Sequence, residues 1–305
     1  MPDTFPATFE VLDDRFRGCS GDARFERLHD DCRWAEGPVY LPAARSLVWS
    51  DIPNDRMLRW DETTGAVGLF RHPCGYTNGH TLDAEGRIVS CEHGGRRVSR
   101  TEHDGSVTTL ADRVDGKRLN SPNDAVVRSD GSIWFTDPSY GIDSDYEGHR
   151  AESETEGCHV YRIDPVTGIC TRVADDFVRP NGLAFSLDER TLYIADTRRN
   201  HLRRFTVGDD LRLTDEGVLA DCSVGVFDGL RLDTEGRIWA AAGDGVHCFD
   251  PDGTLIGKLI VPEPVANLVF GGPKRNRLFV TASTSLYAIL TNVNGAPGPW
   301  QDRSS

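Results

Sequence analysis

The plan of the whole chain can be read from NDAVVRSDGSIWFTD, residues 123–137. A polar residue leads a short apolar run, a Ser-Asp-Gly turn follows, and a second run is rich in β-branched and aromatic residues. Two further segments, 159–164 and 169–174, flank the turn PVTG at 165–168. The four segments together predict four consecutive short β-strands.

This plan occurs six times, and each occurrence opens on a side chain with a carboxylate or amide oxygen. These lead residues are Glu36, Asn78, Asn123, Asn181, Asp228 and, more faintly, Asn267. They are 39 to 58 residues apart, and four strands in a unit of this length predict a propeller blade. The sequence therefore predicts an all-β protein, a six-bladed β-propeller of four-stranded antiparallel blades.

The ring of blades must close, because otherwise the first and last blades would leave strand edges exposed. After Asn267 the chain provides only three strands, at 268–270, 277–281 and 286–290. We expect the alternating segment 23–28 to supply the fourth. The chain then divides into an N-terminal arm, 1–35, the propeller, 36–293, and a C-terminal tail, 294–305.

The composition argues against several classes of partner. A net charge of -14 repels phosphate backbones, so nucleic acid is not expected as a partner. The eight cysteines form no CxxC pair, which argues against zinc-finger and redox motifs and fits a reducing cytoplasm. There is no signal-peptide pattern and no run of roughly 18 apolar residues, so we expect no membrane partner. A cytoplasmic monomer or homodimer is the expected form.

The lead residues carry the functional prediction. The first strand of each propeller blade lines the central channel, so residues at its entrance converge on the axis. Carboxylates and amides crowded there would be poorly solvated without a cation, and an all-oxygen set suits Ca²⁺ best, with Mg²⁺, Mn²⁺ or Zn²⁺ as alternatives. The competing explanation is that Asn-Gly and Asp-Gly are ordinary turn dipeptides, although a turn alone does not explain one register in six units.

At these residues the chain resembles a known family. The segments WAEGP (34–38), NSPND (120–124), RPNGL (179–183) and FDG (227–229) are similar to motifs of the SMP-30/gluconolactonase/LRE family of regucalcin-like lactonases. Residues 129–138, SDGSIWFTDP, resemble the bacterial gluconolactonase branch most closely. The resemblance implies a six-bladed propeller with one catalytic divalent cation on its axis.

Carried over residue by residue, the resemblance implies that Glu36, Asn123, Asn181 and Asp228 bind the metal and that Asp228 is also the general acid/base. The implied reaction is hydrolysis of a sugar lactone such as gluconolactone to the sugar acid, with the cation polarising the lactone carbonyl. Some members carry an Arg two residues before the amide ligand that grips the lactone, but Ser121 occupies that place here.

Five residues are expected to contact this small-molecule substrate: Asn78, His80, Ser121, Tyr140 and Asn267. His80 could equally be a hydrogen-bonded strand histidine. The acidic insertion 141–157 explains the longest spacing and would be either a lid over the channel or a tether.

Two other functions remain open from the sequence. The first is an organophosphate or aryl-ester hydrolase of related propeller type, and the second is a non-catalytic binding platform with a patch of exposed aromatics. The tryptophans at 34, 49, 60, 134 and 239 lie in or beside predicted strands, which predicts core positions instead of a patch.

Overall fold

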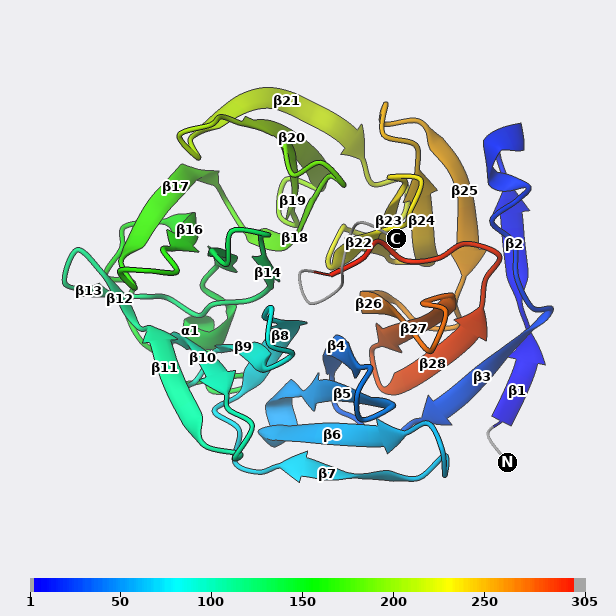
Figure 1. Ribbon diagram of the computed structural model, residues 1–305, viewed down its shortest axis with the longest axis horizontal. Coiled ribbons are helices and arrows are strands. Elements are labelled where there is room, and N and C mark those ends of the chain that lie inside the picture. The colour runs from blue at the N-terminus through cyan, green and yellow to red at the C-terminus, as the bar shows by residue number, and fades with distance from the viewer. Residues whose placement is uncertain (1–2, 299–305) are drawn as a thin grey trace.

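Six antiparallel sheets stand in a ring around a central axis in the computed structural model, which describes residues 3–298 (Figure 1). The blades follow one another around the ring in chain order, and in each of them the chain starts near the axis and steps outward. The predicted six-bladed β-propeller is confirmed.

Four blades hold four strands each. Blade 1 consists of β4 (Ala35–Leu41), β5 (Ser46–Asp51), β6 (Arg56–Asp61) and β7 (Val67–Arg71), and blade 2 of β8 (Thr77–Leu82), β9 (Ile88–Glu92), β10 (Arg97–Thr101) and β11 (Val107–Ala111). Blade 3 consists of β14 (Ala125–Val127), β15 (Ile133–Asp137), β16 (Cys158–Ile163) and β17 (Cys170–Phe177), and blade 4 of β18 (Pro180–Phe185), β19 (Thr191–Asp196), β20 (His201–Val207) and β21 (Leu213–Asp221).

The last two blades include strands from the N-terminal arm. Blade 5 consists of β22 (Leu230–Leu232), β23 (Ile238–Ala242), β24 (Gly245–Phe249), β25 (Leu255–Ile260) and β2 (Thr8–Val11). Blade 6 consists of β26 (Val265–Gly271), β27 (Arg277–Ala282), β28 (Ser285–Leu290), β3 (Arg24–His29) and β1 (Asp3–Pro6). β3 pairs antiparallel with β28, with Arg27 opposite Tyr287, so an N-terminal strand closes the ring as predicted.

These two blades have five strands where the sequence predicted four. The extra strands β1 and β2 are outer edge strands of four residues that are mostly exposed. Apolar residues do alternate through this part of the arm at Phe5, Ala7, Phe9 and Val11, but Pro6 interrupts the run, and a Pro within such a run is typical of an edge strand. Because β2 pairs with blade 5 while β1 and β3 pair with blade 6, the arm fastens the two blades to each other.

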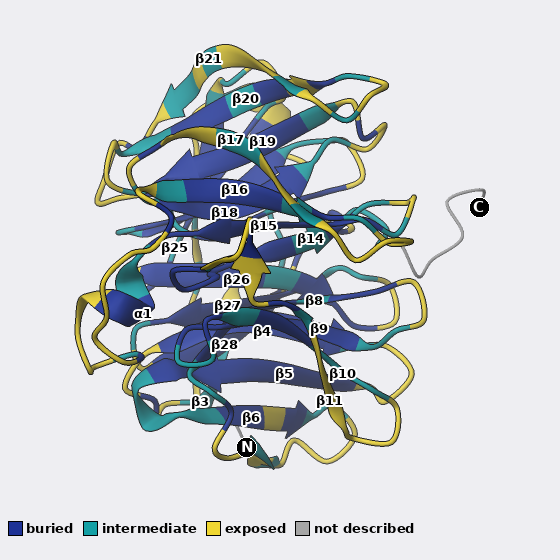
Figure 2. Ribbon diagram, turned by 90° about the vertical axis from the view of Figure 1, so that its left-hand side faces the viewer, coloured by how far each residue is buried: buried dark blue, intermediate teal, exposed yellow. Residues whose placement is uncertain are grey.

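Few described residues lie in other elements. These are the helix α1 (Tyr140–Asp143), the 3₁₀ turns Asp14–Phe16 and Ile52–Asn54, and the small hairpin of β12 (Arg113–Val114) and β13 (Lys117–Arg118). None of the helices between residues 3 and 298 has the length and apolarity to cross a membrane. α1 opens the insertion between β15 and β16 and projects from one face of the disc (Figure 2).

The core lies between the blades, where strands such as β16 and β20 are mainly buried, while outer strands such as β21 are more exposed (Figure 2). Trp49, Trp134 and Trp239 are fully buried and Trp60 is nearly so, as predicted. For Trp34 the prediction was wrong: its side chain is 36% exposed, because it precedes β4 and does not lie within the sheet.

Trp239 offers a test of this packing. Its ring lies 5.9 Å from that of Phe16 in the arm and 5.7 Å from that of Phe270 in blade 6. We expect Trp239→Ala to lower the free energy of unfolding by about 3–5 kcal/mol, because it leaves a large cavity where three parts of the chain meet. Urea titration measures the change, and Trp34→Ala is the matched control with an expected loss below about 1 kcal/mol. Equal losses for the two variants would contradict the assignment of the core.

Candidate metal centre

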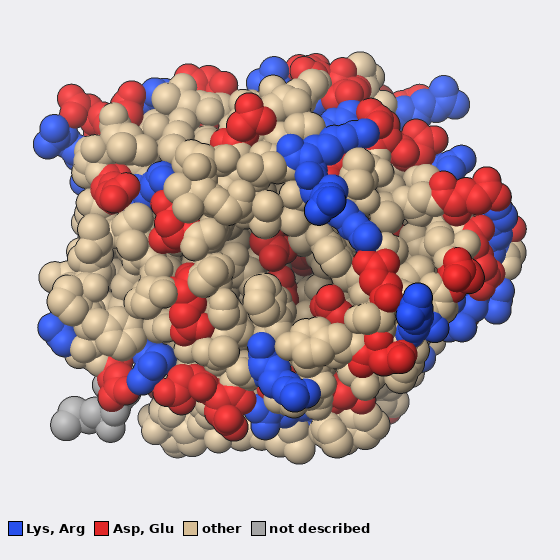
Figure 3. All heavy atoms as spheres, turned by 180° about the vertical axis from the view of Figure 1, so that it is seen from behind, with Lys and Arg blue, Asp and Glu red and all other residues tan. Residues whose placement is uncertain are grey.

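The six lead residues lie on or just before the innermost strands β4, β8, β14, β18, β22 and β26. Five of them, Glu36, Asn78, Asn123, Asn181 and Asn267, are at most 3% exposed. Asp228 is partly exposed as a residue, but its Oδ1 is buried. The face opposite that of Figure 1 is hollowed near its middle, and acidic side chains lie in the hollow (Figure 3).

The strand register shifts at the lead residue in four of the blades. The irregularities fall between Glu36 and Val39, between Thr77 and His80, between Pro180 and Leu183, and between Val265 and Asn267. A β-bulge changes the direction of the side chains beside it and is frequent next to functional sites. The repeat of this bulge explains how successive blades present equivalent residues at the axis.

The glycines after the lead residues show how closely neighbouring blades approach. A Cβ atom on Gly79 would lie 2.5 Å from the carbonyl oxygen of Asn123, and one on Gly182 would lie 2.4 Å from that of Asp228. Neither glycine has a positive φ, so neither serves as a left-handed turn residue. Each is required because the next blade packs directly against it. The turn explanation fails at these positions, and adjacent blades touch at their lead residues.

The first and last blades also meet there. Asn267 Nδ2 donates to Glu36 Oε2 at 3.2 Å, and the same oxygen accepts from Gly37 N at 2.5 Å. Asp228 interacts with both Glu36 and Asn181. The structure therefore brings the predicted residues of blades 1, 4, 5 and 6 together around one axis, and Gly79 places the lead residue of blade 3 in the same ring.

Burial dominates the electrostatics of this ring. Desolvation raises the pKa of Glu36 to about 8 and raises the pKa of Asp228 well above its usual range. The neighbouring carboxylates, including Asp124, raise both pKa values further because like charges disfavour ionisation. Asp124 itself is fully buried and pairs with Arg231 at 3.1 Å.

Three buried oxygens at the lead positions have no hydrogen-bond partner among the described residues: Asn78 Oδ1, Asn181 Oδ1 and Asp228 Oδ1. Buried polar atoms are normally paired, so a group of three calls for an explanation. Between residues 3 and 298 no cluster of three or more His, Cys, Asp or Glu could hold a metal. A cation here would therefore depend on amide oxygens as well as two carboxylates, and this donor set fits a hard ion such as Ca²⁺.

Two residues that the sequence analysis missed fix the orientation of the amides. Thr197 Oγ1 accepts from Asn181 Nδ2 at 3.0 Å and donates to a backbone carbonyl at 2.8 Å. His93 Nδ1 lies 3.2 Å from the carbonyl oxygen of Glu147, which can only accept, so His93 Nε2 accepts from Asn78 Nδ2 at 3.2 Å. Both residues come directly after the second strand of their blade, and this shared position could have revealed them.

Tyr140 joins the ring, whereas Ser121 and His80 do not. The Tyr140 hydroxyl interacts with Thr197 and Asn181, and burial together with the Asp228 carboxylate raises its pKa. Ser121 is fully buried, and its hydroxyl donates to Pro138 O at 2.7 Å and accepts from Gly141 N at 3.0 Å. It therefore holds the start of the insertion.

His80 is held between hydroxyl groups of blades 1 and 2. Its two ring nitrogens lie 2.8 Å from the hydroxyl oxygens of Ser50 and Ser90, and burial lowers its pKa to about 3. Its side chain is 1% exposed. This is the arrangement of a hydrogen-bonded strand histidine, the alternative that the sequence left open.

Arg179, also missed, anchors the insertion against the ring. It stands two residues before Asn181, and its guanidinium lies 5.1 Å from the centre of the Tyr140 ring. It pairs with Asp143 at 2.9 Å and hydrogen-bonds to Ser139. The insertion is therefore packed against the ring at its first residues, and its role as a lid stays a prediction.

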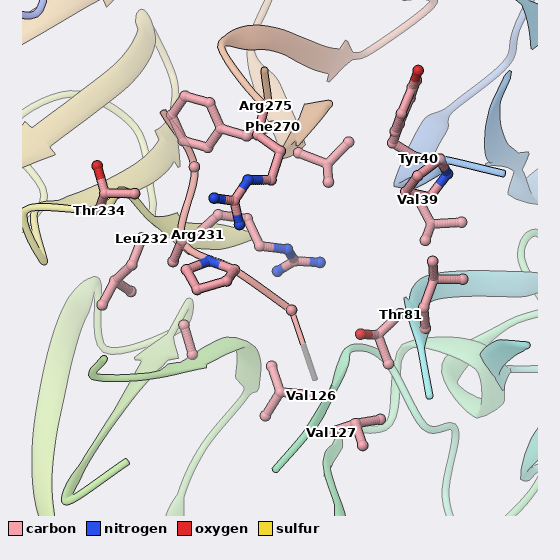
Figure 4. Close-up of a pocket in the computed structure, with 18 of the residues that line it drawn as sticks. Val39, Tyr40, Thr81, Val126, Val127, Arg231, Leu232, Thr234, Phe270 and Arg275 are labelled. Atoms are coloured by element: carbon pink, nitrogen blue, oxygen red, sulfur yellow. The ribbon is translucent and has the colours of Figure 1, made fainter. Parts of the chain in front are cut away.

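A cavity of about 620 Å³ lies at the other end of the channel (Figure 4). It is lined by residues further along the inner strands, among them Val39, Thr81, Val126 and Phe270. Arg231 also borders it, and the ion pair of Arg231 with Asp124 lies on the side of the lead residues. This mainly apolar cavity is thus distinct from the acidic ring.

The propeller and its ring of oxygen side chains define a class of protein. Residues 34–284 match the family model described as the SMP-30/Gluconolactonase/LRE-like region. The chain therefore belongs to the SMP-30/gluconolactonase/LRE-like family, as its motifs indicated.

Particular relatives are similar over most of the chain. A gluconolactonase from Zymomonas mobilis is 30% identical over 308 residues, which covers 88% of this chain and 82% of that protein. A pentonolactonase from Haloferax volcanii is 30% identical over 266 residues, covering 83% and 82%. The solved structure of a gluconolactonase from Xanthomonas campestris superposes with a TM-score of 0.90 at 38% identity, covering 95% of this chain and 97% of that one.

The electrostatics of the ring predict a pH-dependent stability in the absence of cations. The pKa of Glu36 is higher in the folded protein, about 8, than its ordinary value of 4.5, so the folded state binds more protons between these values. The free energy of unfolding must then fall as the pH rises through this window. In EDTA-treated protein we expect a fall between about pH 5 and 9 that is roughly 2–4 kcal/mol larger for wild type than for Glu36→Gln.

Urea titrations at several pH values measure this difference. Glu152→Gln, which removes an exposed carboxylate of the insertion, is the control and should follow wild type. Parallel pH profiles for wild type and Glu36→Gln would show that Glu36 is not held protonated by burial.

Proposed function

We propose that this protein is a divalent-cation-dependent lactonase that hydrolyses a sugar lactone of the aldonolactone class, such as gluconolactone, to the open sugar acid. The gluconolactonases and the pentonolactonase to which the chain is similar support this substrate class. The observation that carries the proposal is the ring of buried oxygens: two amide oxygens and one oxygen of Asp228 lack partners among the described residues, and burial raises the pKa values of Asp228 and Glu36.

Glu36, Asn123, Asn181 and Asp228 would hold the cation, with Ca²⁺ first and Zn²⁺, Mn²⁺ or Mg²⁺ as alternatives. When bound, such an ion supplies Lewis-acid polarisation of a carbonyl oxygen. Two carboxylates balance its double charge. Thr197 supports the site because its hydrogen bond to Asn181 Nδ2 leaves the Oδ1 atom of that amide facing the ring without a partner.

Asp228 would move the protons of the reaction. It would accept a proton from the water that adds to the carbonyl carbon of the lactone. It would then return a proton to the oxygen atom within the lactone ring as the bond between that oxygen and the carbonyl carbon breaks. Its buried Oδ1 has no competing donor among the described residues. Asn78, Asn267 and Tyr140 border the ring and would contact the lactone around the reacting centre.

Removal of cations tests the metal requirement. We expect EDTA followed by gel filtration to abolish gluconolactone hydrolysis. Stoichiometric Ca²⁺, Mn²⁺ or Zn²⁺ should restore it, because the side-chain oxygens of the lead residues then bind a cation again. Acid release measured with a pH-indicator dye gives the rate. Full turnover in protein shown to be free of metal would remove the cation from the proposal.

A phosphotriester assayed in parallel separates the alternatives. Cation-dependent turnover of the phosphotriester without turnover of lactones would favour an organophosphate hydrolase. If neither class of substrate is turned over with any of these ions, a binding platform becomes the better description.

Substitution of Asp228 tests the proton transfers. Asp228→Asn keeps the size of the side chain but removes the base, so we expect kcat for gluconolactone to fall by roughly 10³-fold. The midpoint temperature of thermal unfolding should be unchanged or higher, because the variant removes a buried carboxylate. A kcat within a few-fold of wild type at saturating Ca²⁺ would exclude Asp228 as the general base.

A further inference from the structure

The insertion of blade 3 brings a carboxylate to the mouth of the ring. Glu147 lies in it, and its backbone oxygen accepts a hydrogen bond from His93 Nδ1 at 3.2 Å. Two residues later, His149 N donates to Gly141 O at 2.9 Å, and the His149 ring packs on Tyr76 with centroids 5.3 Å apart. A Cβ atom on Gly148 would lie 2.1 Å from Gly141 O, so the turn is tightly packed. The backbone thus fixes where Glu147 stands.

The Glu147 carboxylate lies beside His93, close enough to Asp228 for its charge to act on it, and has no cationic partner in contact among the described residues. It is 26% exposed, and its charge raises the pKa of Asp228. The charge of Arg179 acts on Glu147, but Arg179 pairs with Asp143 at 2.9 Å. His93 Nδ1 lies 3.6 Å from Glu147 Oε2, but burial lowers the pKa of His93 to about 4, so His93 is neutral. Within residues 3–298 no side chain or backbone group donates a hydrogen bond to this carboxylate.

An unpaired carboxylate beside other carboxylates is unfavourable for stability. Burial, and after it the charge of Asp143, raises the pKa of Glu147 to about 7. Groups held in such a position are concentrated at functional sites. A carboxylate offers two oxygens that only accept hydrogen bonds, and a polyol offers adjacent hydroxyls that donate them. The aldonolactones carry several hydroxyl groups besides the reacting ester.

We propose that Glu147 is a specificity-determining residue that accepts hydrogen bonds from the hydroxyl groups of the sugar lactone, and that His93 is a positioning residue that holds Glu147 and Asn78. This inference rests on the proposed lactonase function and deepens it. His93 contacts both elements, since Nδ1 donates to the insertion and Nε2 accepts from Asn78 Nδ2. His93 therefore links the insertion that carries Glu147 to the lead residue Asn78.

The test compares a hydroxylated lactone with one that lacks hydroxyls. For Glu147→Ala we expect kcat/KM for D-glucono-1,5-lactone to fall roughly 10–100-fold, mainly through KM, because about two hydrogen bonds to a charged group are lost. The value for δ-valerolactone should change less than about two-fold, because this lactone carries no hydroxyl group. For Glu147→Gln, which keeps one acceptor oxygen, kcat/KM for D-glucono-1,5-lactone should lie between the values for wild type and Glu147→Ala. Glu152→Ala, which removes an exposed carboxylate of the same insertion, should leave kcat/KM for both lactones unchanged.

The ratio of the two kcat/KM values is the readout for His93 as well. His93→Phe should lower this ratio, and His93→Gln, which retains an amide acceptor, should restore part of it. A purely structural defect would lower kcat/KM for both lactones by the same factor and leave their ratio unchanged. That result would overturn the inference. An unchanged ratio in Glu147→Ala would also overturn it.

A binding experiment separates this inference from the lactonase proposal. Titration calorimetry with D-gluconate in the presence of Ca²⁺ should give a Kd at least 10-fold weaker for Glu147→Ala than for wild type. If wild type hydrolyses no lactone but binds gluconate with this contrast, the hydroxyl site stands and the lactonase proposal fails. If wild type hydrolyses lactones normally but gluconate binds equally well to wild type and Glu147→Ala, the lactonase proposal stands and the role of Glu147 is wrong.

Discussion

Asn267 and Glu36 meet at 3.2 Å although 231 positions separate them in the chain, and the geometry of the axis depends on that contact. It joins the last blade to the first, and it can form only because β3 completes blade 6 from the opposite end of the chain. Once the ring is closed, the lead residues have no freedom to separate. Two carboxylates are then held in a desolvated ring, a cost that the packing between blades must offset.

The same closure explains the glycines and bulges of the inner strands. Six blades can converge only if their inner strands pass very close to one another, and Gly79 and Gly182 lack the Cβ atoms that would prevent this. The bulges rotate the chain at the lead residue so that a strand that continues into the core still offers a polar side chain to the axis. Close approach and re-aimed side chains are thus two consequences of one constraint.

Repetition determined how much could be predicted from the sequence. The six lead residues share a register, so their convergence followed from the blade count, and the alternating segment before blade 1 revealed the closing strand. The sequence left two roles open for His80, and a register shift between Thr77 and His80 accompanies the one in which it hydrogen-bonds inside the sheets. His93 and Thr197 are single polar residues with no pattern inside one blade, and only their common place after a second strand connects them. Glu147 lies on an insertion with no period, so its position depends on the path of the loop.

The charges around the axis can be balanced residue by residue. Asp124 is neutralised by Arg231, which reaches it from the border of the apolar cavity, and Asp143 is neutralised by Arg179 on the side of the insertion. Glu36 and Asp228 are left without a basic partner in contact among the described residues, which gives two uncompensated negative charges when both are ionised. Protonation removes these charges, and the raised pKa values of Glu36 and Asp228 mean that both carboxylates bind protons more readily than usual. A divalent cation would remove the same two charges, so protons and the cation would compete for one site. The acidity of the medium would then control occupancy through Glu36 and Asp228, and Glu147 would add to this effect from the insertion because its charge raises the pKa of Asp228.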